Sequence, residues 1–175
     1  EFAQIFLFDP LSGKSTMLTD GESKNGAISW SKDGSLIAYQ STRRNGRSND
    51  IWMMTSDSPE DASILLESDN GSWWGPSDWS EDNKKVMALE YISANHSNIY
   101  MIDVEKKETT LVVGTEDKQS SNFGLGFDKD NQGIFFTTNQ YSDYRQLAYK
   151  DLNTGEIRLI TKDIKWDVSE FELSK

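Results

Sequence analysis

The stretch WSKDGSLIAYQSTRRNGRSNDIWMM, Trp30 to Met54, decides the fold because it recurs twice more along the chain. The further copies are WSEDNKKVMALEYISANHSNIYMID from Trp79 and FDKDNQGIFFTTNQYSDYRQLAYKD from Phe127. Each copy carries an aspartate in its first turn, and these are Asp33, Asp82 and Asp130. They follow one another at steps of 49 and 48 residues. A period of this length is typical of a repeat architecture.

Each repeat predicts four short strands. The first strand ends at the aromatic residue, and a polar turn rich in Asp, Asn and Gly follows it. The second strand is nearly continuous in apolar and β-favouring residues, as expected of a strand that packs on both faces. A polar loop leads to a third strand, and a second turn leads to a fourth. Four strands at such a period predict a β-propeller blade.

The sequence therefore predicts an all-β chain, a β-propeller fragment of about three and three-quarter four-stranded antiparallel blades. Half a blade is expected over 4–19, complete blades over 27–66, 74–113 and 121–161, and the first strand of a further blade over 167–175. Propellers typically close with about four to eight blades, so a larger parent propeller is expected. An ordinary antiparallel sandwich with accidental repetition is the competing interpretation.

Composition argues against several kinds of partner. The 175 residues contain 18 Lys and Arg against 29 Asp and Glu, a net charge of −11, which disfavours a phosphate-rich nucleic acid. No stretch is long enough for a membrane helix, and no cysteine is present to form a disulfide or a cysteine zinc site. We therefore expect no cofactor, metal, nucleic acid or membrane partner. The compartment stays open between the cytoplasm and the periplasm or exterior.

The sequence offers no catalytic set of its own. His96 is the only histidine, and it lies in the segment ISANHSN, which is expected to be a polar loop with a solvated side chain. A Ser-His-Asp triad needs a histidine base, and no G-x-S-x-G motif is present. The acidic segment Asp128–Gly133 departs from a calcium-binding loop at the fifth and twelfth positions. It is expected to be a blade hairpin, and the chain by itself is not expected to be an enzyme.

RRNGR, which contains Arg43, Arg44 and Arg47, is the only basic cluster. Asn-Gly is a strong two-residue hairpin signal, so the arginines are expected to project from a loop tip. They would either bind a carboxylate or a neighbouring domain, or form a solvated loop on an acidic protein.

SWWGPSDW, Ser72 to Trp79, is expected to connect one blade to the next. Its adjacent tryptophans, Trp73 and Trp74, would either pack between blades or line a mouth of the central channel and touch a ligand or partner. The same two interpretations apply to Tyr141 and Tyr144, which are expected in the loop between the second and third strands of the last blade.

Three stretches resemble the amino-terminal propeller of the prolyl oligopeptidase family of serine peptidases. They are GSWWGPSDWSEDNKKVMALEYISANHSNIYMIDVEKKETTLV, SDYRQLAYKDLNTGEIRLIT and DIKWDVSEFELSK. The WSKDG and WSEDN turns also resemble the wider group of WD-repeat-like propellers, which includes the Tol translocation protein. The FDKDNQG turn departs from the family's more usual Ser-Pro-Asp-Gly type. The family's catalytic Ser, Asp and His lie in its α/β-hydrolase half, so none is assigned to a residue of this chain.

The resemblance implies a non-catalytic propeller domain of a serine peptidase, a hydrolase. It would gate the access of peptide substrates and dock the α/β-hydrolase domain of the same parent chain. The alternative is a stand-alone propeller that binds a protein or ligand, and a third option is self-association through open blade edges. The residues expected to contact a partner or substrate are Arg43, Arg44, Arg47, Trp73 and Trp74.

Overall fold

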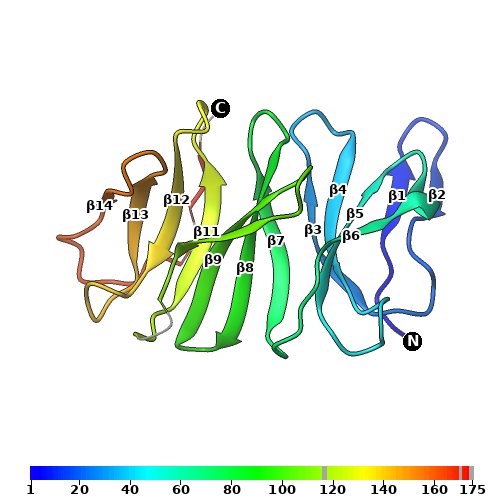
Figure 1. The fold of residues 1–175 in the computed structure, drawn as a ribbon. Coiled ribbons are helices and arrows are strands. Elements are labelled where there is room, and N and C mark those ends of the chain that lie inside the picture. Colours follow the sequence, from blue (N-terminus) through cyan, green and yellow to red (C-terminus); the bar gives the residue numbers. More distant parts are fainter. Residues whose placement is uncertain (116–117, 170, 174–175) are drawn as a thin grey trace.

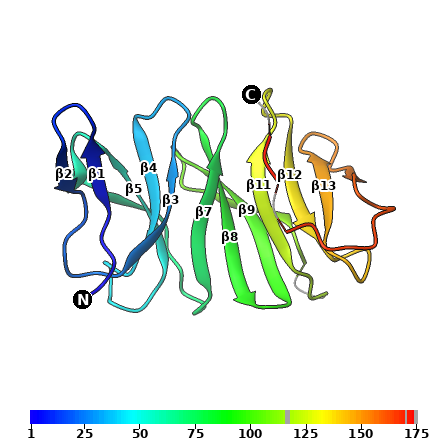
Figure 2. The same cartoon turned by 180° about the vertical axis from the view of Figure 1, so that it is seen from behind.

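The computed structural model describes residues 1–115, 118–169 and 171–173. Within these residues the chain forms one sheet of two strands and three sheets of four strands. The sheets stand side by side in an open arc, and the chain visits them in sequence order (Figures 1 and 2). This arrangement confirms the predicted all-β propeller fragment and excludes the sandwich interpretation, because the sheets follow one another around an arc.

The two-stranded sheet is the half-blade, formed by β1 (Phe6–Asp9) and β2 (Lys14–Met17). Blade 1 contains β3 (Asn25–Trp30), β4 (Leu36–Ser41), β5 (Asp50–Thr55) and β6 (Ser63–Leu66), with a 3-10 turn at Pro59–Asp61. Blade 2 contains β7 (Trp73–Trp79), β8 (Lys85–Ser93), β9 (His96–Asp103) and β10 (Thr109–Val113). Blade 3 contains β11 (Asn122–Phe127), β12 (Gly133–Thr138), β13 (Gln146–Asp151) and β14 (Ile157–Leu159).

Every blade is an antiparallel meander whose strands pair in chain order. The first strands, β3, β7 and β11, contact one another from blade to blade and are the inner strands of the arc. Each ends at the aromatic residue that the repeat predicts. Over 167–175 the described residues contain no assigned strand, and 170, 174 and 175 lie outside the described part. The opening strand of a further blade stays a prediction.

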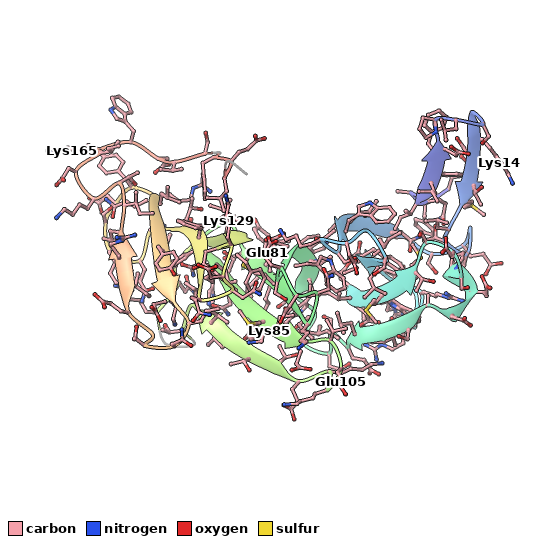
Figure 3. All side chains as sticks on the ribbon, turned by 90° about the horizontal axis from the view of Figure 1, so that it is seen from above. Lys14, Glu81, Lys85, Glu105, Lys129 and Lys165 are labelled. Carbon is pink, nitrogen blue, oxygen red and sulfur yellow. The ribbon has the colours of Figure 1, made fainter. Side chains whose placement is uncertain are left out.

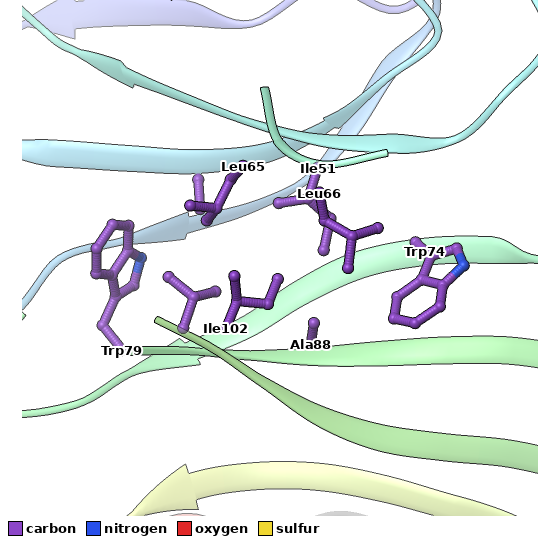
Figure 4. Close-up of a cluster of buried hydrophobic side chains, with 9 residues drawn as sticks. Ile51, Leu65, Leu66, Trp74, Trp79, Ala88 and Ile102 are labelled. Carbon is purple, nitrogen blue, oxygen red and sulfur yellow. The ribbon is translucent and has the colours of Figure 1, made fainter. Parts of the chain in front are cut away.

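The apolar core lies between neighbouring sheets. One cluster fills the space between the half-blade and blade 1, a second joins blades 1 and 2, and a third joins blades 2 and 3. In β4, Ile37 belongs to the first cluster and Ala38 to the second. The second strand of a blade therefore packs on both faces, which explains its continuous run of apolar residues. In the cluster between blades 1 and 2, Trp74 and Trp79 lie at opposite ends (Figure 4).

The half-blade covers blade 1 only in part. Trp30 is 42% exposed, whereas Trp79, at the same position of the next repeat, is completely buried. Trp79 Nε1 donates a hydrogen bond to the carbonyl of Ser29 in the preceding blade at 3.1 Å. Among the described residues β1 pairs with β2 alone, so the other edge of β1 is open, and Ile28 and Trp30 of β3 are exposed. The first strand of blade 1 therefore leaves apolar side chains open to solvent.

The first turns of neighbouring blades are joined by a repeated contact. The backbone N–H of Lys32 donates to Asn83 Oδ1, and the N–H of Glu81 donates to Asn131 Oδ1, both at 2.7 Å. Asn83 and Asn131 have positive φ angles of 58° and 56°. Asparagine tolerates this left-handed conformation, and its side chain supplies the acceptor at the same time.

We expect replacements of Asn83 to separate these two roles. Asn83→Gly keeps the left-handed backbone and removes only the acceptor, so it should lower the free energy of unfolding by about 1 kcal/mol. Asn83→Ala also removes the short polar side chain that lets asparagine tolerate the left-handed region, so it should cost about 2 kcal/mol. Urea unfolding of both variants measures the difference. Equal losses would show that the backbone conformation contributes nothing.

Candidate functional site

The two ends of the blades differ in chemistry. The turn face carries the first turns of the blades, and charged residues such as Glu81 and Lys129 lie on it (Figure 3). The opposite end, here called the connection face, is formed by the links between second and third strands and by the links between blades. The exposed apolar side chains on this face include Tyr91, Ile92, Tyr141 and Tyr144. Exposed aromatic residues are enriched at binding surfaces, so the connection face is the candidate site.

Blade 2 contributes a long hairpin to the connection face. Its strands β8 and β9 pair as far as Ser93 and His96, so only residues 94 and 95 form the turn. This hairpin presents Tyr91 and Ile92 to solvent. The expectation of a polar loop over ISANHSN is wrong, because the strands continue through it. The prediction of a solvated His96 is also wrong, since its Nε2 is buried without a hydrogen-bond partner in the described structure.

Arg44 is held inside the loop between β4 and β5. Its Nε and Nη2 donate to the two carboxylate oxygens of Asp50 at 2.8 and 3.0 Å, a bidentate pair. Asp50 is completely buried and also accepts a hydrogen bond from the N–H of Ser68 at 2.8 Å. The hydrogen bond to Asp50 raises the pKa of the Arg44 guanidinium above its ordinary value. Arg44 therefore fixes this loop, and the expectation that it projects from a tip is wrong.

Arg43 and Arg47 lie in the same loop with different surroundings. The Arg43 guanidinium lies 5.3 Å from the centre of a Trp52 ring, with Nε 3.7 Å from Asp20 Oδ2, so it folds back along the blade. Arg47 is exposed beside Gly46, which has a φ of 75°. The Asn-Gly pair is not a two-residue hairpin, because the loop runs over 42–49. Contact of Arg43, Arg44 or Arg47 with a partner stays a prediction.

The paired tryptophans belong to inner strand β7, so the expectation that they lie in a connection is wrong. Trp74 is buried between blades 1 and 2, and its ring centre lies 4.8 Å from that of Tyr100. Trp73 is half-buried, and its ring covers Gly75 so closely that a Cβ at Gly75 would come within 2.3 Å of it. Partner contact by Trp73 and Trp74 stays a prediction, and burial makes Trp73 the better placed of the two.

Trp74 changes the chemistry of its seam between blades. The equivalent residues of the other repeats are Asn25 and Asn122. Their amide groups donate to carbonyls of the part of the chain that precedes each blade, Asn25 to Ala3 at 3.2 Å and Asn122 to Ser97 at 2.7 Å. At the equivalent position of blade 2, the ring of Trp74 packs against Tyr100 in place of such an amide hydrogen bond. Alignment of the repeats places a tryptophan where the other two have asparagine, but only the structure shows which residue the ring contacts.

A layer of buried polar groups supports the connection face. Glu90 is buried and accepts hydrogen bonds from the side-chain amides of Asn70 at 2.6 Å and Asn98 at 3.0 Å. In the next seam Thr138 Oγ1 donates to Asn122 Oδ1 at 2.6 Å. Asn98 Oδ1 is buried without a hydrogen-bond partner among the described residues, so the network around Glu90 is only partly satisfied. The connection face therefore presents exposed aromatic side chains above a layer of buried hydrogen bonds, an arrangement suited to binding.

The described residues contain no cluster of three or more His, Cys, Asp or Glu side chains with the geometry to hold a metal ion. They also contain no helix with the length and hydropathy needed to cross a membrane.

Radially stacked four-stranded meanders define the class of the β-propellers. No family model and no curated protein matches the chain. Among solved structures, TolB from Acinetobacter baumannii superposes with a TM-score of 0.73 at 16% identity, over 93% of this chain and 38% of that protein. A puromycin-hydrolyzing peptidase from Mycobacterium tuberculosis gives 0.69 at 11% identity, over 90% and 27%.

Prolyl oligopeptidase B from Galerina marginata gives a TM-score of 0.62 at 16% identity, over 83% of this chain and 21% of that chain. The chain thus spans only about a fifth to two-fifths of these proteins. At such identities the similarity establishes the propeller fold, which TolB-like proteins and peptidases share.

Proposed function

We propose that the chain is a non-catalytic propeller domain of a prolyl oligopeptidase-like serine peptidase. In this proposal it docks an α/β-hydrolase domain of a longer chain and limits which peptides reach the active site. The observation that carries the proposal is the connection face, where exposed aromatic residues stand above a layer of buried hydrogen bonds. Two of the similar structures are peptidases, and prolyl oligopeptidase B was solved with a bound 35mer substrate.

The composition of the connection face favours docking there over the turn face. Protein interfaces are enriched in Tyr and Arg and depleted in Lys, Glu and Asp. The connection face exposes Tyr91 and Ile92 of blade 2 and Tyr144 of blade 3. Arg47 of blade 1 is exposed on the same face. The first turns contribute mainly charged side chains. We therefore place the hydrolase domain against the connection face.

A fluorophosphonate, which labels an activated serine, tests this function on the full-length parent protein. We expect one labelled serine outside residues 1–175, and labelling that is lost on denaturation. The double variant Tyr91→Ser, Ile92→Ser should reduce the labelling rate about tenfold by weakening the docking, since both side chains are exposed and the blade remains folded. The control is Lys129→Ser on the turn face, which should label at the parental rate.

A stand-alone binding module is the second candidate, favoured by the superposition on TolB with a TM-score of 0.73. A folded full-length protein that takes up no label would support this candidate and contradict the peptidase proposal. Self-association through the open edge of β1 is measured separately by light scattering. A monomer at high concentration would exclude it.

A further inference from the structure

An open groove lies between the outer strands of blades 1 and 2. Its volume is about 800 Å³, and it is bordered by β6, the outermost strand of blade 1, and by the start of β10. Most of its lining is aromatic or aliphatic, from Trp52, Ile64, Leu65, Leu66, Trp74 and Tyr100. An exposed strand edge beside an apolar groove is the setting in which an extended peptide adds as a further strand.

Opposite charges stand at two positions along the β6 edge. Glu67 follows β6 directly and lines the groove. It shares the Arg44 guanidinium with Asp50 and Asp69, so negative charge predominates at this end. Lys107 lines the groove from blade 2, and its Nζ donates to the carbonyl of Ile64 at 2.8 Å. The ammonium group thus occupies an acceptor that an added strand would use.

Lys107 adopts a left-handed backbone conformation, which is uncommon for a residue other than glycine. In three turns of the chain, an N–H donates to the carbonyl of the aspartate that starts the turn, and the donors are Gly13, Lys107 and Gly155. All three have positive φ, at 69°, 57° and 76°. Two of the turns use glycine, which adopts this conformation without strain, whereas blade 2 holds a lysine there. From this strained position the lysine side chain reaches the carbonyl of Ile64 at the border of the groove.

We propose that this groove binds a short peptide with free termini as an additional antiparallel strand on β6. Antiparallel addition places the peptide's amino group beside Glu67 and its carboxylate beside Lys107. The distance from Ile64 to Glu67 corresponds to about 10 Å of extended chain, the length of three or four residues. The peptide's backbone N–H replaces the ammonium at the Ile64 carbonyl, and its apolar side chains contact Trp74 and Tyr100. This site goes beyond the proposed docking function and does not require a hydrolase domain.

The test titrates the 175-residue chain with the free tetrapeptide Ala-Phe-Ala-Phe, followed by calorimetry and by NMR of the backbone amides. The matched probe is the same peptide with an acetylated amino end and an amidated carboxyl end. We expect the blocked peptide to bind about tenfold more weakly, with about threefold lost for each terminal charge. The amide shifts of the free peptide's complex should centre on β6 and the Lys107 turn.

Two variants connect the effect to the two charges. Lys107→Gly should bind the free and the amidated peptide equally, and glycine fits the positive φ, so its melting temperature should not fall. Glu67→Gln should bind the free and the acetylated peptide equally. The controls Lys106→Ala and Glu60→Gln should keep the full preference for free termini. Equal binding of free and blocked peptides to the parent chain, shifts on another face, or no binding at about 5 mM peptide would each overturn the proposal.

Discussion

Asp50→Ala should lower the free energy of unfolding by about 3 kcal/mol, which corresponds to a fall of roughly 6 to 12 °C in melting temperature. The carboxylate of Asp50 is completely buried and accepts hydrogen bonds from Arg44 and from the N–H of Ser68. Removing it deprives a partly buried guanidinium and a buried backbone donor of their acceptor. Calorimetric melting of the variant and the parent measures the loss.

The matched control for Asp50 is Asp69→Ala. Asp69 contacts the same guanidinium at 3.2 Å, but its side chain is 79% exposed. Water screens such a pair, so this variant should change stability by no more than about 0.5 kcal/mol. Similar losses in both variants would contradict the assignment of Asp50 as the anchor of the loop. Asp50→Asn, which introduces the residue found at the equivalent Asn98 of blade 2, should fall between the two.

Trp79→Ala should be the most damaging single truncation, at about 4 kcal/mol. The ring is completely buried between blades 1 and 2, and its Nε1 donates to the carbonyl of Ser29 in the preceding blade. The variant loses the apolar contacts of the ring, leaves a cavity at one end of the cluster in Figure 4, and removes the indole hydrogen bond to the Ser29 carbonyl. Urea unfolding monitored by circular dichroism gives the difference in free energy.

Trp30→Ala controls for the residue type, because Trp30 occupies the same position one repeat earlier. At 42% exposure it should cost about 1 kcal/mol or less. The comparison holds the strand position and the substitution constant and changes only the burial. If Trp30→Ala proved as costly as Trp79→Ala, the half-blade would cover more of blade 1 in solution than the structure shows.

The blades were predictable because their determinants are local and repeated. The aromatic residue that ends a first strand, the turn aspartate and the apolar second strand recur in register, so three copies support one interpretation. The turns at Asn83 and Asn131 need a positive φ, and asparagine is a residue type that tolerates this conformation. Element order and antiparallel pairing followed from these signals.

The candidate site was less predictable from the sequence. Its geometry depends on hydrogen bonds between residues that are distant in sequence, and on strand pairing through a segment of polar composition. The basic loop was expected to be exposed, since nothing local shows that Asp50 and the carbonyl of Ser68 hold Arg44. The segment ISANHSN looks polar, yet cross-strand pairing continues through it to Ser93 and His96. Tertiary pairing overrides local polarity at such positions.

The position of blade 2 between two complete neighbours has a consequence for the dynamics of the chain. In linear arrays each unit is stabilised mainly by its nearest neighbours, so the middle unit opens last. Blade 2 packs against apolar clusters on both sides, whereas the half-blade consists of two short strands whose residues are mostly exposed. Local opening should therefore begin at β1 and β2 and reach β8 and β9 last, which makes the hairpin carrying Tyr91 and Ile92 the most persistent structure of the molecule.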